Sequence, residues 1–141
     1  MISRKDILLN ESLITEARLN LQQKESENFI QRLSLLFNNC MNHYINMTNN
    51  ETDELLIVNI EKEAFILLNL MRRYSIFITY NYFDALKESL EFFTDIDSAD
   101  IRQIFIQINK MHDRIICFSH EYGIKERYYN EDLYNECNEI K

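Results

Sequence analysis

The feature that most restricts the fold of this chain is its near lack of the two strongest turn-forming residues. It has one glycine, Gly123, and no proline. A β-sandwich or β-barrel needs residues that accept tight-turn geometry at every corner, so this composition nearly excludes both classes. The excess of Ile and Asn over Gly, Pro and Ala is also what an AT-rich genome produces. Whatever the origin of this bias, the turns must be built from Asn, Asp, Ser and Thr.

Hydrophobic residues in the first third of the chain recur at the spacing of an α-helix. Steps of three and four relate the apolar residues of Ile7–Leu21, with Ser3 as the expected N-cap. The same steps place nine apolar residues on a single face, namely Phe29, Ile30, Leu33, Leu36, Phe37, Cys40, Met41, Tyr44 and Ile45. A polar stretch separates the two segments. The sequence therefore allows either one long helix or two helices joined near Lys24–Ser26.

The segment Leu55–Phe93 is apolar on more than one face, which is typical of a helix at the centre of a bundle. Because about 40 residues exceed the length of an ordinary helix, we expect a break or kink between Arg72 and Tyr82. The β-branched and aromatic residues of Tyr74–Phe83 also fit a strand. We favour a helix there, because no neighbouring segment with turn residues is available to pair with a strand.

Polar clusters mark the expected helix ends. The sequence NMTNNE, residues 46–51, predicts a turn, after which Thr52 or Asp53 caps the next helix. The sequence DIDS, residues 95–98, predicts a second turn and cap. The apolar stripe that follows begins at Ile101 and ends at Tyr122, just before the single glycine, which accepts positive φ and predicts a helix C-terminus.

A last, looser helix is expected between residues 124 and 141, where tyrosine and aliphatic residues alternate with many charges. No internal repeat or linker divides the chain. The sequence therefore predicts an all-α protein in which residues 1–141 form one domain, a bundle of four or five helices around one core.

Composition and charge restrict the partners. Hydrophobic residues make up 46% and charged residues 27% of the chain, a globular balance, and the longest apolar run, Ala64–Leu68, is far too short to span a bilayer. The amino-terminal residues do not resemble a secretion signal, so a cytoplasmic location is expected. The net charge is −8 and no run of basic residues exceeds a pair, which disfavours nucleic-acid duplexes and membrane surfaces as ligands. A basic protein partner is compatible with this charge; the acidity also favours solubility.

The thiols and imidazoles lack the spacing of metal sites. The three cysteines form no CxxC pair, and the three histidines form no HxxxH or HExxH pattern. His112 beside Asp113 is the only hint of a metal ligand pair, and one glycine cannot build a Gly-rich phosphate loop. We expect no metal and no cofactor. The cysteines are Cys40, Cys117 and Cys137, and the histidines are His43, His112 and His120.

The segment DRIICFSHEYG, residues 113–123, has two interpretations. On a helix, Arg114 and His120 are six residues apart and lie about 120° from each other around the axis. In the structural interpretation, Arg114 pairs with Glu121 or with carboxylates of a neighbouring helix. His120 is then a polar residue near a helix C-terminus, where the helix dipole favours its cationic form.

The functional interpretation is a family resemblance. Arg114, five intervening residues, His120 and Tyr122 resemble the signature of the HEPN superfamily, which is an Arg, four to six residues and a His, with a Tyr two places on in some bacterial members. The resemblance implies a dimerising helical bundle that cleaves RNA without a metal. Arg114 would then stabilise the charge on the scissile phosphate, and His120 would transfer a proton or bind the substrate. In toxin–antitoxin members the Tyr is a target of modification. The residue after the arginine, usually polar in the family, is Ile115 here.

The function we favour from the sequence is that of a small acidic protein-binding module without catalysis. Such a module could be an inhibitor, an immunity or antitoxin-like protein, an anti-defence factor or an adaptor of a phage, virus or mobile element. Size, acidity and eight tyrosines support it, because tyrosine is favoured in protein contacts. A structural subunit of a larger assembly is a third class, and homo-oligomerisation is compatible with all three. The contact residues expected are Tyr128, Tyr129, Glu131, Asp132 and Tyr134.

Overall fold

The computed structural model describes residues 3–73, 80–98, 100–121, 123–124 and 129–140. Within these ranges every regular element is helical, which confirms the predicted all-α class. The elements in chain order are α1 (Arg4–Thr48), α2 (Glu54–Arg73), α3 (Tyr80–Phe93), the short 3₁₀ helix η2 (Ile96–Ser98), α4 (Ile101–Glu121) and α5 (Glu131–Glu139).

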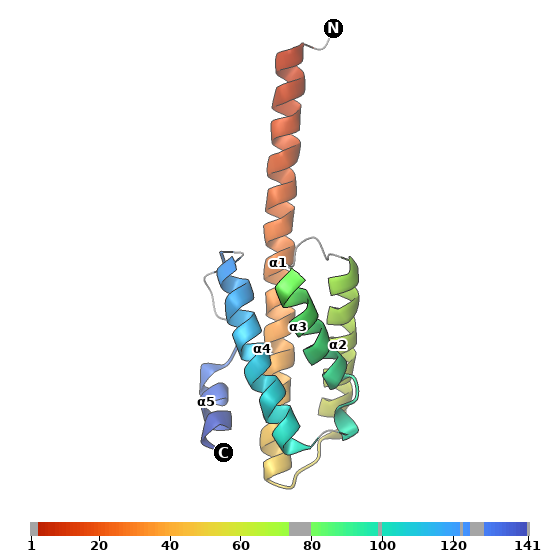
Figure 1. The fold of residues 1–141 in the computed structure, drawn as a ribbon, viewed down its shortest axis with the longest axis vertical. Helices are drawn as coiled ribbons and strands as arrows, with labels where there is room; N and C mark the ends of the chain where they lie inside the picture. The colour runs from red at the N-terminus through yellow and green to blue at the C-terminus, as the bar shows by residue number, and fades with distance from the viewer. Residues whose placement is uncertain (1–2, 74–79, 99, 122, 125–128, 141) are drawn as a thin grey trace.

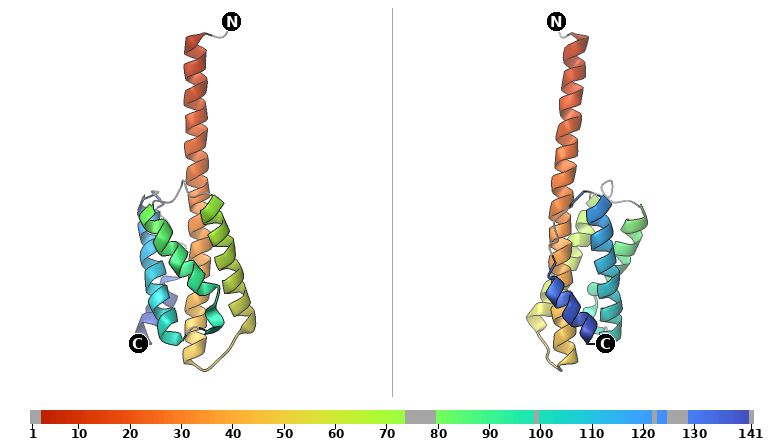
Figure 2. Two further views of the ribbon diagram at one scale, coloured as in Figure 1. Left: turned by 45° about the vertical axis from the view of Figure 1, so that its right-hand side comes forward. Right: turned by 90° about the vertical axis from the view of Figure 1, so that its left-hand side faces the viewer.

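Helices α1 to α4 form an up-and-down bundle in which each helix packs beside the next and α4 closes the ring against α1 (Figure 1). The short helix α5 lies outside this ring and packs against α1 (Figure 2). The bundle thus has four long members and one peripheral helix, in agreement with the predicted four or five.

The first helix settles the choice between one long helix and two short ones. Helix α1 is continuous over 45 residues, beginning directly after Ser3, and at 1.5 Å per residue it is about 67 Å long. Its first part extends alone beyond the end of the bundle, whereas its second part forms one side of the core (Figures 1 and 2). Among its described side chains, full burial begins at Ser26. We call residues 4–24 the arm.

The core is built from the apolar stripes that the sequence predicts. Eight of the nine residues of the α1 stripe are buried, and the ninth, Ile45, is partly buried against them. Leu67 of α2, Leu90 of α3 and Ile108 of α4 are fully buried in the same core. The eight buried stripe residues of α1 are Phe29, Ile30, Leu33, Leu36, Phe37, Cys40, Met41 and Tyr44.

Asparagine and aspartate form the turns, as the composition requires. Asn50 takes a positive φ of 58° after α1 ends. The backbone N–H of Leu56 donates to Asp53 Oδ1 at 3.1 Å, so Asp53 caps α2. The cap of α4 is Asp100, whose Oδ1 accepts from the N–H of Gln103 at 2.8 Å. It lies two residues after the predicted DIDS cap, because residues 96–98 form η2 first.

The predicted break in the long apolar segment is present, since α2 ends at Arg73 and α3 begins at Tyr80. Residues 80–83 of the segment that also fitted a strand are helical, and residues 74–79 lie outside the described residues. Among the helices of the described chain, none has the length and apolar character that crossing a membrane requires.

Gly123 terminates α4 as predicted. Its φ is +68°, its N–H donates to the carbonyl of His120 at 3.3 Å, and the N–H of Ile124 donates to the carbonyl of Ser119 at 2.8 Å. This pair of bonds is a Schellman motif, which requires a left-handed residue at this position.

Substituting Gly123 by alanine is expected to lower the free energy of unfolding by about 1 kcal/mol, because a Cβ is disfavoured at positive φ. A Cβ at this position meets no atom within 4 Å, so the cost is one of backbone conformation and not of a steric clash. Chemical denaturation measures it. Asparagine, which tolerates positive φ better than alanine, should recover part of the loss, and equal stability of G123A and the native chain would contradict the assignment.

Candidate functional site

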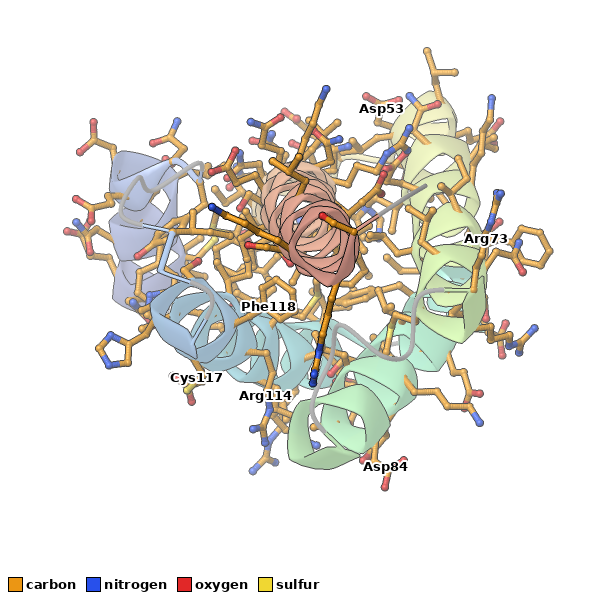
Figure 3. All side chains as sticks on the ribbon, turned by 90° about the horizontal axis from the view of Figure 1, so that it is seen from above. Asp53, Arg73, Asp84, Arg114, Cys117 and Phe118 are labelled. Carbon is orange, nitrogen blue, oxygen red and sulfur yellow. The ribbon has the colours of Figure 1, made fainter. Side chains whose placement is uncertain are left out.

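The two residues of the HEPN-like motif lie on different sides of α4. Arg114 is half-buried and lies on the side of α4 that neighbours α3, whereas Phe118 is directed toward α1 and Cys117 outward (Figure 3). One turn before Arg114, Lys110 Nζ lies 3.8 Å from Glu88 Oε1 of α3. His120 is exposed in the last turn of α4. One chain therefore does not bring the guanidinium and the imidazole together, and Tyr122 lies outside the described residues.

A different histidine is at the centre of the most developed side-chain network. The ring of His112 on α4 is stacked on that of Tyr134 on α5, with centroids 4.1 Å apart and an angle of 6° between the planes. The ring of Tyr129 meets His112 edge-on at 5.3 Å and Phe37 of α1 edge-on at 5.6 Å. We call these four residues, Phe37, His112, Tyr129 and Tyr134, the aromatic cluster.

Hydrogen bonds fix the polar edges of the aromatic cluster. His112 Nε2 lies 3.1 Å from the Tyr129 hydroxyl, and His112 Nδ1 lies 3.6 Å from Asp113 Oδ1. The Tyr134 hydroxyl donates to Asn109 Oδ1 at 3.3 Å. A carboxylate, an imidazole and a phenol are the kinds of group from which proton relays are built, but the 3.6 Å between Asp113 and His112 is too long for a hydrogen bond. Tyr129 is also only 7% exposed, so its ring is covered by the surrounding elements and contributes mainly to packing.

The aromatic cluster attaches α5 to the bundle. Asn38 Oδ1 accepts from the N–H of Asn130 at 2.9 Å, and Asn130 Oδ1 caps α5 by accepting from the N–H of Leu133 at 3.1 Å. Farther along, the Cys137 thiol donates to the carbonyl of Met41 at 3.7 Å. A nine-residue helix is not stable alone. These contacts therefore determine that α5 forms where it does.

The structure divides the residues predicted to bind a partner. Tyr129 is buried and Tyr134 is partly buried, and both rings belong to the aromatic cluster. Glu131 and Asp132 are exposed in the first turn of α5. Tyr128 lies outside the described residues. Among the described residues of the predicted surface, Glu131 and Asp132 are therefore the exposed ones, whereas Tyr129 and Tyr134 pack into the bundle.

Sequence reasoning missed the aromatic cluster because its other three members are 75 to 97 positions from Phe37, on α4, on α5 and in the segment before α5. The adjacent His112 and Asp113 are the only local signal, and in the sequence this pair suggests a metal ligand pair. In the described part of the chain, no group of three His, Cys, Asp or Glu side chains has the arrangement to hold a metal ion.

Burial raises the thiol pKa of Cys40 and Cys137. It raises the pKa of the Cys40 thiol well above its ordinary value, and it raises that of Cys137 to about 12, with the nearby Glu136 adding to the shift. Since the thiolate is the nucleophilic form, neither sulfur is activated for catalysis. Cys117 is half-exposed.

The outer face of α2 carries exposed apolar residues that periodicity alone did not single out. Leu55, Val58 and Phe65 are 70%, 55% and 60% exposed. Their spacing of three and seven residues places them on one stripe of the helix. We call these three residues the α2 face.

Comparison with known protein families, characterised proteins and solved structures finds no match for this chain.

Proposed function

We propose that this protein is a non-catalytic protein-binding module, of the inhibitor, antitoxin-like or adaptor kind, that inserts the α2 face into an apolar groove of a partner protein. The observation that carries the proposal is the exposure of three large apolar side chains on one helical stripe, since monomeric proteins rarely leave such side chains grouped in contact with water. Helices bind grooves through anchors at this spacing.

The charges around the α2 face indicate the chemistry of the partner. Glu51, Asp53 and Glu54 are all exposed where α2 begins, directly before Leu55. The whole chain carries a net charge of −8. We therefore infer a partner whose groove is apolar and whose rim is basic beside the N-terminal end of α2.

The position of α2 in the bundle makes this face available. The opposite side of α2 buries Ile60, Ala64, Leu67 and Met71 in the core. Arg32 Nη1 of α1 lies 2.9 Å from Glu63 Oε1 of α2, a partly exposed salt bridge that adds to this packing. The α2 face is therefore presented on a helix that is rigid before binding, so little conformational entropy is lost on association.

The experiment that tests this proposal has two stages. Affinity capture from the native host should first yield one stoichiometric partner, and titration calorimetry should then measure its binding to the purified chain. The double variant Val58→Glu/Phe65→Glu is expected to weaken that binding by at least about tenfold, because two apolar anchors become charged. Added salt should weaken binding of the native chain, since acidic and basic groups meet at the rim.

The matched control is the double variant Ile106→Glu/Ile116→Glu, which introduces the same two charges at exposed apolar positions of α4. It should bind as the native chain does, and circular dichroism should show all variants equally helical. Native-like affinity of the α2 variant, or equal losses in both variants, would reject the α2 face as the contact surface. Failure to capture any stoichiometric partner would count against a binding module altogether.

Glu131 and Asp132 are a second candidate contact, because both are exposed on the outside of α5. Replacing both by lysine changes the net charge by four units without altering a residue of the aromatic cluster. A basic partner that touches α5 should then lose affinity and lose part of its salt dependence. A partner that touches only the α2 face should be unaffected, so this variant separates the two surfaces.

The alternative function is a HEPN-like metal-independent ribonuclease. The helical bundle agrees with the resemblance, and α4 carries Arg114 and His120 with five residues between them. Because the two side chains lie on different sides of α4, catalysis would require a second subunit to complete the cleft. RNA cleavage in a chelator, abolished by Arg114→Ala and by His120→Ala, would support the enzyme. No cleavage by the native chain under these conditions would eliminate it.

A further inference from the structure

The outer side of α2 carries a charge at each end of the α2 face. Helices α1 and α3 flank α2, and no described element covers this outer side (Figures 1 and 2). Glu54, in the first turn, and Arg72, in the last turn, are both exposed. They are 18 residues apart, which is five full helical turns, so they project from the axis in the same direction. The side that bears Val58 and Phe65 therefore runs from a carboxylate to a guanidinium.

A third charge lies between the apolar anchors. Lys62 is exposed four residues after Val58 and three residues before Phe65, so it borders both side chains on the surface of the helix. An ammonium group that is enclosed in an apolar contact without a carboxylate loses its hydration at a net cost in free energy. A surface that covers the α2 face is therefore favoured when it places a carboxylate opposite Lys62.

This order of charges matches a second helix that runs in the opposite direction. Protein helices favour carboxylates in the first turn and cations in the last turn, because of the helix dipole. An antiparallel neighbour with that bias places its cations beside Glu54 and its carboxylates beside Arg72. A parallel neighbour with the same bias would place like charges together at both ends. The α2 face thus favours an antiparallel helix, whose side chains pack between anchors at helical spacing.

Given the proposed function, we propose that the wall of the partner's groove is an amphipathic helix that lies antiparallel to α2. This helix carries basic residues beside Glu54, carboxylates beside Lys62 and Arg72, and apolar residues against the α2 face. The rim of the groove is thus basic at one end only and acidic toward the other. Charge therefore fixes the direction in which α2 enters the groove, in addition to the affinity.

A second copy of this chain fits the ends of the α2 face but not its middle. Pairing Glu54 of each copy with Arg72 of the other places the two-fold axis at residue 63, halfway between them. The two Lys62 residues would then lie about 3 Å apart along the helices and on the same side of the pair, so their charges would repel. Glu63 does not neutralise them, because it is bound by Arg32 on the side of α1. The charges therefore favour a different protein as the occupant.

Two synthetic helical peptides of about 20 residues, the length of α2, serve as probes. Both carry leucines at helical spacing on one side. In the bipolar peptide the flanking residues are glutamates in the N-terminal and central turns and lysines in the C-terminal turns, whereas in the basic peptide all are lysines. Titration calorimetry at about 0.15 M salt limits the long-range effect of the net charge of −8. The full native chain should bind the bipolar peptide about tenfold more tightly than the basic one.

Charge reversal on α2 should remove this preference. Lys62→Glu/Arg72→Glu is expected to bind the basic peptide at least as tightly as the bipolar one, which shifts the ratio of the two dissociation constants by about tenfold or more. The matched control is Arg102→Glu/Lys110→Glu, which makes the same change at exposed positions of α4 and should leave the ratio as it is in the native chain. Circular dichroism checks that the variants remain equally helical.

A nitroxide label on the N-terminus of the bipolar peptide determines the direction by NMR. It should broaden the amide signals of residues 69–73 when the peptide lies antiparallel to α2, and those of residues 54–58 when it lies parallel. Broadening at residues 54–58, preference of the native chain for the basic peptide, or a ratio that Lys62→Glu/Arg72→Glu leaves unchanged would each overturn the proposed partner helix. Failure of both peptides to bind would overturn it as well.

The proposed function can fail separately. Loss of peptide binding in Val58→Glu/Phe65→Glu supports the α2 face as the contact surface even when the peptides show no charge preference. Peptide binding that survives Val58→Glu/Phe65→Glu would instead place the contact elsewhere and reject both. Sedimentation equilibrium of the chain alone tests the remaining occupant, since a dimer that is lost in Val58→Glu/Phe65→Glu would assign the α2 face to a second copy.

Discussion

Replacing Phe37 by alanine is expected to lower the free energy of unfolding by about 3–5 kcal/mol, the range for removing a buried phenyl ring. Phe37 is fully buried on α1 and contacts the rings of His112, Tyr129 and Tyr134. Its loss leaves a cavity where α1, α4 and α5 meet. The aromatic contacts add to the cost, because each pair stabilises beyond the area it buries.

Urea denaturation followed by circular dichroism measures the change. Phe65→Ala is the matched control, since it removes the same ring from an exposed position on α2 and should cost less than about 1 kcal/mol. Hydrogen exchange should show α5 losing protection first in the Phe37 variant, because the aromatic cluster is its main attachment. Equal losses in the two variants would mean that the aromatic cluster does not hold the fold together.

Acidification is expected to destabilise the protein through His43. This residue of α1 is 3% exposed, and its Nδ1 has no hydrogen-bond partner among the described residues. Burial lowers the pKa of His43 below its ordinary value of 6.5, and the carboxylates of Asp97 and Asp53 oppose the shift without cancelling it. The folded state thus holds the neutral imidazole, whereas the unfolded chain binds a proton below pH 6.5.

The sign of the effect follows from proton linkage. Because the unfolded state binds more protons in this window, the free energy of unfolding falls as the pH is lowered from 6.5 toward the folded-state pKa, and it is unaffected by this group above 6.5. Each unit by which the folded-state pKa lies below the unfolded-state pKa lowers the free energy of unfolding at acid pH by about 1.4 kcal/mol.

Denaturation curves between pH 7.5 and pH 5, before most carboxylates titrate, measure this dependence. His43→Gln removes the titrating group and should flatten the curve. A slope that persists in the His43 variant would assign the proton uptake to another group.

Most of the fold follows from local sequence signals. The stripes of α1 and α4, the cap at Asp53 and the stop at Gly123 are all short-range patterns, and backbone sterics or helical periodicity determine their outcome. The cap of α4 was predicted too early, because η2 forms within DIDS and leaves the capping to Asp100. The sequence also left the continuity of α1 open, since its polar stretch breaks the apolar pattern without containing a helix breaker.

The candidate sites follow the sequence less closely. The motif around Arg114 was visible, but which side of α4 each residue occupies relative to α3 depends on how the helices pack. Tyr129 and Tyr134 were expected at a contact surface because tyrosine favours interfaces, and the fold uses both rings to attach α5. The same residue type serves either purpose, and only its neighbours decide which.

Sequence alone thus determined the helices, most of their ends and the acidic character of the chain, because periodicity, capping and charge act over a few residues. Tertiary structure decided what no short window contains: that Phe37, His112, Tyr129 and Tyr134 form one cluster, that His43 is buried near two carboxylates, and that the α2 face and the arm are left uncovered by the bundle. The physical reason is that burial depends on which stripes meet. That pairing is chosen by the packing of all four long helices together.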